Sequence, residues 1–148
     1  MQSIYLATAL VLLGGVLLSV QAPLNAMLGR AVGSPVNAAL ISFLVGTAAL
    51  SMIALAQRAS PNGTLMRTLP WYGWVGGLCG AVFVTAAAYA APRIGVATML
   101  TLAVASQLVM AVILDHTGAF GVRQHAASVG RIIGLLFVVA GAIIVRKY

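Results

Sequence analysis

The sequence predicts an all-α, polytopic integral membrane protein with five transmembrane helices. Of the 148 residues, 62% are hydrophobic, only 6% are charged, and the mean hydropathy is +1.10. Soluble domains carry roughly 25% charged residues, so this chain is too apolar to be one. Its apolar runs are far longer than a membrane-spanning β-strand of about 10 residues and therefore indicate helices. The length fits a single membrane domain over residues 1–148.

The helices are expected at residues 4–28, 35–56, 71–91, 94–114 and 127–145. The first is one apolar run that ends before Arg30. Ser34 and Pro35 are typical of the N-cap and the first residue of the second helix. A polar loop follows the second helix, and its Ser-Pro-Asn-Gly segment at residues 60–63 is a strong turn signal.

Aromatic and polar residues mark the ends of the last three helices. The third begins with Trp-Tyr-Gly-Trp at residues 71–74, and such aromatic side chains are enriched at membrane interfaces. Pro92 and Arg93 predict a tight turn before the fourth helix, which Asp-His-Thr-Gly at residues 115–118 ends. The fifth carries Arg131 in its first turn, where a long cationic side chain reaches the interface.

The first helix has a polar break near its end. Pro23 has no N–H for the carbonyl of Ser19, four residues earlier, so the helix should kink or open there. Gln21 and Asn25 lie four residues apart and share a face at this point. An apolar segment interrupted by proline beside polar side chains points to the binding site of a transporter. The alternative is a kinked helix whose amides hydrogen-bond to neighbouring helices.

Glycine spacing predicts close helix contacts. Two pairs lie four residues apart in the third helix, and one pair lies seven apart in the fifth. In lipid, such G-x-x-x-G and heptad spacings let two backbones approach closely. The glycines expected at helix-packing or dimer contacts are Gly73, Gly76, Gly77, Gly80, Gly134 and Gly141.

The charges suit a membrane rather than a nucleic acid. The net charge is +7, but the cations are scattered singly between apolar runs, where they serve as lipid anchors and topology signals. An odd number of spans puts the termini on opposite sides. The side of the N-terminus then holds Arg58, Arg67, Arg123 and Arg131, and the other side holds Arg30, Arg93, Arg146 and Lys147. This balance predicts insertion in both orientations and an antiparallel homodimer; the alternative is one orientation set by details that the count misses.

Asp115 is the only carboxylate side chain in the sequence. As a functional residue it would attract a cation or relay a proton with His116, and as a structural residue it would cap a turn or pair with an arginine on the same side. An acid at the membrane boundary costs less than one at the centre. Two histidines and one cysteine on separate segments make a poor metal set. No hydrolase, phosphate-loop or heme pattern is present, so we expect no cofactor and no enzyme activity.

Several segments in order resemble the YdcZ-type five-helix branch of the drug/metabolite transporter superfamily. They are residues 21–25 (Gln-Ala-Pro-Leu-Asn), 41–47 (Ile-Ser-Phe-Leu-Val-Gly-Thr), 76–81, 91–95 (Ala-Pro-Arg-Ile-Gly), Gln107 and 115–118. Residues 134–141 are also similar to the last helix of small multidrug resistance transporters, where a glycine heptad packs the dimer.

The resemblance implies a bacterial inner membrane protein that supplies half of a ten-helix unit built from two inverted five-helix halves. The second half would be another copy of the chain or a paralogous five-helix chain. Small multidrug resistance transporters place a glutamate in the first helix for proton–cation exchange. The first helix here has no carboxylate, which argues against that mechanism.

The expected function is a small secondary transporter that moves a small organic molecule by alternating access. Inverting a second subunit would bring Gln107 of one chain near the depth of Gln21 of the other, and Asp115 near that of Asn25. The predicted substrate-binding residues are these four and Tyr89. One alternative is a non-transporting membrane interaction or scaffold protein, and a second is a multidrug-type cation exporter that uses Asp115.

Overall fold

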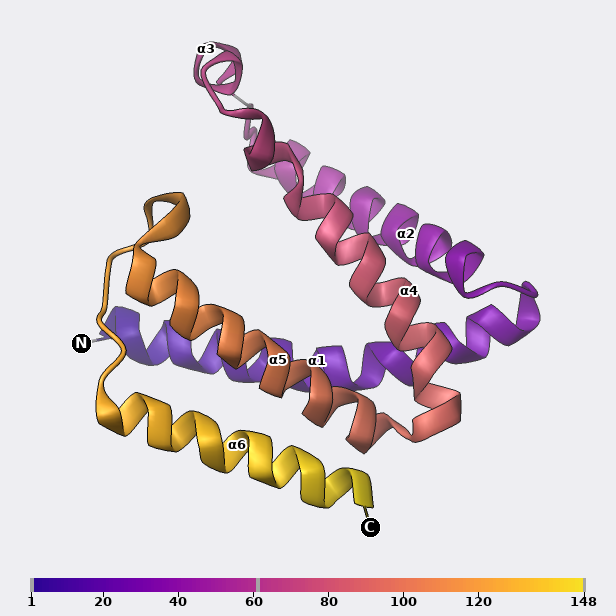
Figure 1. Ribbon diagram of the computed structural model, residues 1–148. Helices are drawn as coiled ribbons and strands as arrows, with labels where there is room; N and C mark the ends of the chain where they lie inside the picture. The colour runs from indigo at the N-terminus through magenta and orange to yellow at the C-terminus, as the bar shows by residue number, and fades with distance from the viewer. Residues whose placement is uncertain (1, 61, 148) are drawn as a thin grey trace. The chain divides into compact units, whose positions relative to one another are not determined.

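The computed structural model describes residues 2–60 and 62–147, and within them the protein is built from helices and short connections (Figure 1). The long helices are α1 (Gln2–Ala31), α2 (Pro35–Ala56), α4 (Gly76–Ile94), α5 (Val96–Thr117) and α6 (Val129–Lys147). The short ones are α3 (Gly63–Arg67), η1 (Trp71–Trp74) and η2 (Ala119–Gly121). In the described part of the chain, 5 helices are long and apolar enough to cross a membrane. The prediction of an all-α protein with five membrane-spanning helices is confirmed.

The chain divides into two compact units, Met1–Arg93 and Ile94–Tyr148. The first contains α1, α2, α3, η1 and α4, and the second contains α5, η2 and α6.

The first helix stays helical through its proline, so of the two outcomes expected at Pro23 the structure has the kink and not the opening. α1 includes Pro23 and continues to Ala31, and at about 1.5 Å per residue its 30 residues make it roughly 45 Å long. Figure 1 shows α1 changing direction in its second half without a break in the ribbon. A proline removes one hydrogen bond from the helix, and the loss is absorbed as a bend rather than an interruption.

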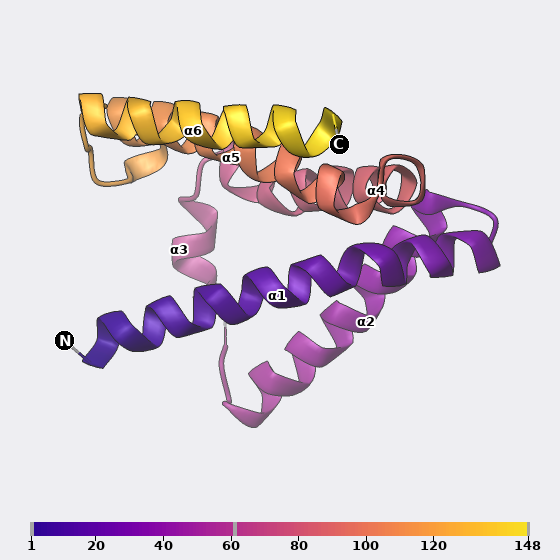
Figure 2. The ribbon, with the colours of Figure 1, turned by 90° about the horizontal axis from the view of Figure 1, so that it is seen from below.

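The connection between α1 and α2 follows the predicted capping pattern. Gly33 takes a φ of 75°, a left-handed conformation that glycine adopts without strain. Ser34 is the N-cap, and its Oγ accepts a hydrogen bond from the backbone N–H of Asn37 at 3.4 Å. Pro35 is the first residue of α2, as expected from its preset φ and missing N–H. From this short connection α1 and α2 diverge (Figure 2).

The first unit packs through small side chains. Its buried apolar residues are almost all alanines, which let helix backbones approach closely without a hydrophobic driving force from water. A Cβ on Gly80 of α4 would lie 3.4 Å from Cζ of Phe43 of α2, so this glycine admits the aromatic ring. The buried residues in this unit are Ala22, Asn25 and Ala26 of α1, Ala38 and Ala39 of α2, and Val84, Ala87, Ala88 and Ala91 of α4.

The ends of α4 differ from the prediction. The aromatic segment that was expected to open the helix forms the 3₁₀ turn η1, and α4 begins at Gly76. The expected tight turn at Pro92 and Arg93 is wrong, because α4 runs through both residues to Ile94. The chain turns at Gly95, which has φ 82° and ψ 150° and precedes α5. Glycine is the residue that takes this backbone conformation without steric cost, so it sets the boundary.

In the second unit, α5 and α6 lie side by side and run in opposite directions (Figures 1 and 2). α5 continues to Thr117, three residues beyond the expected end, and stops where Gly118 adopts the left-handed conformation with φ 67° and ψ 21°. The backbone N–H of Gly118 donates to the carbonyl of Leu114 at 2.8 Å. A left-handed glycine after the last turn is a common way to end a helix.

Candidate functional site

The predicted substrate-binding residues are divided between the two units. Gln21, Asn25 and Tyr89 lie in the first, and Gln107 and Asp115 lie in the second. Gln21 is half-buried, while Asn25 is 6% exposed and its side chain makes no hydrogen bond to any described residue. Among the described residues no fully buried side-chain nitrogen or oxygen lacks a hydrogen-bond partner, so the amide of Asn25 keeps access to the surface.

Tyr89 lines an apolar pocket in the first unit. The pocket has a volume of about 620 Å³ and lies between the start of α2 and the middle of α4. Its polar side chains are those of Thr85 and Tyr89, and neither Gln21 nor Asn25 lines it. Small-molecule pockets typically measure about 300–1,000 Å³ and combine apolar walls with a few polar groups. The pocket is lined by Pro35, Val36, Ala81, Val82, Thr85, Ala86 and Tyr89.

An arginine that was not among the predicted site residues covers the ring of Tyr89. The guanidinium carbon of Arg93 lies 3.6 Å from the ring centroid, and Nη1 of Arg93 donates to the carbonyl of Tyr89 at 2.5 Å. A cation over an aromatic face is held by the ring quadrupole, worth ~0.5–1 kcal/mol at an exposed site. Because the two residues lie four apart on α4, helical spacing alone could have indicated this pair.

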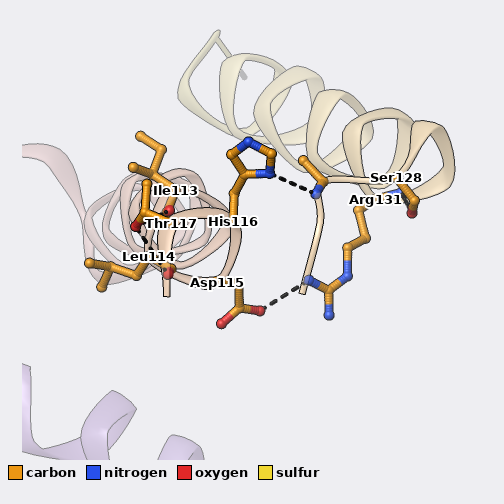
Figure 3. Close-up of polar contacts among 8 residues, drawn as sticks. Ile113, Leu114, Asp115, His116, Thr117, Ser128 and Arg131 are labelled. Atoms are coloured by element: carbon orange, nitrogen blue, oxygen red, sulfur yellow. Dashed lines mark hydrogen bonds and ion pairs between the residues drawn. The ribbon is translucent and has the colours of Figure 1, made fainter. Parts of the chain in front are cut away.

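In the second unit, Asp115 is held by an arginine of the following helix. Oδ2 of Asp115 lies 3.1 Å from Nη1 of Arg131, and both side chains are partly exposed (Figure 3). Arg131 is one of the four arginines that the sequence placed on the same side of the membrane as Asp115. The carboxylate of Asp115 therefore neutralises a cation of its own chain, as the structural interpretation of Asp115 requires.

Hydrogen bonds tie the connection after α5 back to the helix end. Gln124 Nε2 donates to the carbonyl of His116 at 2.7 Å, and the backbone N–H of His125 donates to the carbonyl of Asp115 at 2.8 Å. The backbone N–H of Ala127 donates to Nδ1 of His116 at 3.3 Å. His116 therefore accepts a hydrogen bond that helps to position the connection, and the ion pair of Asp115 and Arg131 lies beside it (Figure 3).

The ion pair borders a second pocket of about 440 Å³ between α5 and α6. Apart from Asp115 and Arg131 its walls are apolar, and Gly134 of α6 lines it. Gln107 is exposed on α5 and does not line this pocket. The remaining lining residues are Leu108, Ala111, Val112, Leu135 and Val138.

The predicted packing glycines have different surroundings. Gly80 approaches Phe43, and a Cβ on Gly73 would meet the side chain of Leu69 at 2.6 Å. The other four have open space where a Cβ would stand, so their contacts within the described residues are not close; they are Gly76, Gly77, Gly134 and Gly141. Among the described residues no three metal-ligating side chains gather.

Residues 6–144 match the protein family described as "Putative inner membrane exporter, YdcZ". The chain belongs to the YdcZ family. It is 30% identical over 143 residues to the inner membrane protein YdcZ of Escherichia coli (strain K12). The aligned residues cover 96% of this chain and 95% of the relative. No solved structure matches the chain.

Membership of the YdcZ family confirms the resemblance drawn from the ordered motifs. With its five apolar helices, the chain is a multi-pass protein of the bacterial inner membrane. The family is one of membrane exporters rather than enzymes, which makes this chain a membrane transporter by class.

Proposed function

We propose that the chain is a secondary transporter that moves a small organic molecule by alternating access, working as an antiparallel homodimer. We infer the substrate class from the pocket of about 620 Å³, which has apolar walls and the hydroxyls of Thr85 and Tyr89. Its size and lining suit a neutral or amphipathic compound. A multivalent ion would require several charged ligands, and this pocket has none.

The antiparallel arrangement rests on the balance of positive charges across the bilayer. Five spans put four cations on each side, so Lys and Arg in the connections do not favour either orientation. An inverted second copy would also supply partners at matching depth for polar groups of the first.

Transport can be tested in everted membrane vesicles from cells that produce the protein, with a neutral amphipathic dye and the cationic dye ethidium as probes. Wild type should move the neutral dye, and Tyr89→Ala should abolish that flux because it removes the pocket wall and one hydroxyl. Tyr5→Ala is the matched control, since Tyr5 is 72% exposed on α1 and does not line the pocket. Wild-type vesicles that move neither probe, or equal flux in the two variants, would contradict the proposed site.

The amides distinguish the transporter from an interaction protein. Gln21→Leu and Gln107→Leu should reduce flux while the dimer still forms, if the amides line the transport path. If the amides only bond helices together, flux should follow dimer stability and nothing else. A cation exporter that depends on Asp115 predicts loss of ethidium flux in Asp115→Asn, and unchanged flux excludes it.

The orientation can be read from a topology reporter fused to the C-terminus. Antiparallel assembly predicts reporter signal from both sides of the membrane in comparable amounts. Adding two lysines next to Arg146 should shift the population to one orientation and lower flux, because the two halves would no longer pair head to tail. Signal from one side alone in the wild-type chain contradicts the homodimer proposed here.

A further inference from the structure

A second pocket in the first unit is lined by two arginines. It has a volume of about 240 Å³ and lies where the ends of α1 and α4 meet the start of α2. Arg30 belongs to the last turn of α1 and Arg93 to the last turn of α4. The other lining residues are small or cyclic, and they are Ala26, Gly29, Gly33, Pro35, Ala88 and Pro92.

The two guanidinium groups have no carboxylate to neutralise them. Residues 1–93 contain no aspartate or glutamate, and the one acidic side chain of the whole sequence is paired with Arg131 in the other unit. Within the described residues, the side chain of Arg30 makes no hydrogen bond or ion pair. Two cations that line one pocket repel each other, and an anion bound between them would remove that repulsion. No acidic side chain of the first unit can supply this anion.

The site is organised for a small anion. The ring and the carbonyl of Tyr89 fix the guanidinium of Arg93, which has five N–H donors and uses one of them on that carbonyl. Pro35 places the N-terminus of the 22-residue helix α2 at the pocket, and helix N-termini attract negative charge. Gly33 has a φ of 75°, and no other atom lies within 4 Å of the position that a Cβ would take, so the backbone leaves the approach open.

The depth of the pocket indicates where that anion comes from. Arg30 and Arg93 follow two apolar spans that run in the same direction, so both lie at one membrane surface, at the level of the lipid headgroups. The volume is below the roughly 300–1,000 Å³ of pockets for whole ligands, but it is enough for a phosphate group. Basic pockets between transmembrane helices commonly hold the headgroups of anionic lipids.

We propose that Arg30 and Arg93 form a binding site for the phosphate of an anionic phospholipid, seated between the ends of α1 and α4 at the start of α2. The lipid would join α1, α2 and α4 at this surface. The site does not depend on the identity of the transported molecule or on dimer orientation.

The test is lipid binding to the detergent-purified full chain, measured by native mass spectrometry during titration with phosphatidylglycerol. Arg30→Gln/Arg93→Gln should weaken phosphatidylglycerol binding roughly 10- to 30-fold. This estimate assumes that each arginine contributes as much to binding as one Lys or Arg near an anionic membrane surface. The matched control is Arg58→Gln/Arg67→Gln, which removes the same charge from the loop at the other surface and should bind as wild type does. Equal loss in both double variants would overturn the site, because net charge alone would then explain it.

Two further arms identify the ligand. Phosphatidylcholine, with a phosphate but no net charge, should bind at least several-fold more weakly than phosphatidylglycerol. Inorganic phosphate at millimolar concentration should not displace phosphatidylglycerol, and displacement would assign the site to a soluble phosphate compound instead of a lipid.

If the glutamine variant does not fold, Arg30→Lys/Arg93→Lys retains the charge and loses the planar donors. Unchanged phosphatidylglycerol affinity in that lysine variant supports a site that recognises charge. Wild-type binding that does not weaken at high salt would overturn the arginine site.

Discussion

The ion pair between Asp115 and Arg131 makes a quantitative prediction about stability. Neutralising either residue removes the attraction across 3.1 Å between α5 and the start of α6. The appropriate measurement is a double-mutant cycle with Asp115→Asn, Arg131→Gln and the double variant. The cycle isolates the energy of the pair from the other effects of each change.

The expected coupling energy follows from distance and exposure. Two unit charges 3.1 Å apart attract by ~1.3 kcal/mol in bulk water and by ~5 kcal/mol at an effective dielectric constant of 20. The side chains are 42% and 39% exposed, so solvent screens their attraction. The bulk-water value of ~1.3 kcal/mol is therefore the most that the pair can contribute. Holding two long side chains in place costs entropy, and measured exposed pairs contribute ~0.2–1 kcal/mol. We expect a coupling of ~0.5–1 kcal/mol.

The assay is reversible unfolding in mixed micelles at increasing dodecyl sulfate fraction. The coupling should shrink by more than half in 1 M salt, where the screening length is about 3 Å. A coupling below ~0.2 kcal/mol would contradict the ion pair. The same variants separate the two roles of Asp115: a structural role predicts that Asp115→Asn and Arg131→Gln change flux equally. Loss of flux in Asp115→Asn alone, at equal stability, would show that the carboxylate takes part in transport.

Three glycine substitutions test other parts of the structure. Gly118→Ala should destabilise the protein by ~1–2 kcal/mol, because φ is 67° and the new Cβ would lie 3.4 Å from that of Gln124; a stability equal to wild type in micelle unfolding would contradict the left-handed cap. Gly29→Ala should be neutral or stabilising by up to ~1 kcal/mol, since its nearest neighbours would lie at 3.6 Å or more. Gly134→Ala also has open space within the chain, so in the monomer it should be neutral or stabilising by up to ~1 kcal/mol. If Gly134 packs the dimer, the same substitution should raise the monomer fraction in cross-linking at dilute protein-to-lipid ratios.

The local sequence determined the number and type of elements, because these depend on interactions close in the chain. Long apolar runs specify spans, since every backbone group in lipid must be bonded within its own helix. Ser34 and Pro35 specified the start of α2, where the structure has that cap. The ordered motifs also indicated the YdcZ family and with it the inner membrane, which the family match confirms.

Boundaries were less predictable where two signals compete. Pro92 suggested a turn, but α4 runs through it to Ile94, and the positive φ of Gly95 ends the segment instead. At Pro23 the same residue type sits inside α1, where the helix bends and continues. In both places the helix continues past a proline that removes one hydrogen bond, so proline alone did not mark a helix end.

The sequence by itself determined that this is a five-span protein with balanced positive charge and one acid, since composition and periodicity are properties of the chain alone. Tertiary structure decided which charged groups have partners. Asp115 meets Arg131 across 16 positions of sequence, and Arg30 lines a pocket with Arg93 although helix α2 separates them in the chain. Such pairings depend on how helices pack, and in lipid that is set by small residues and shape, which no local pattern encodes.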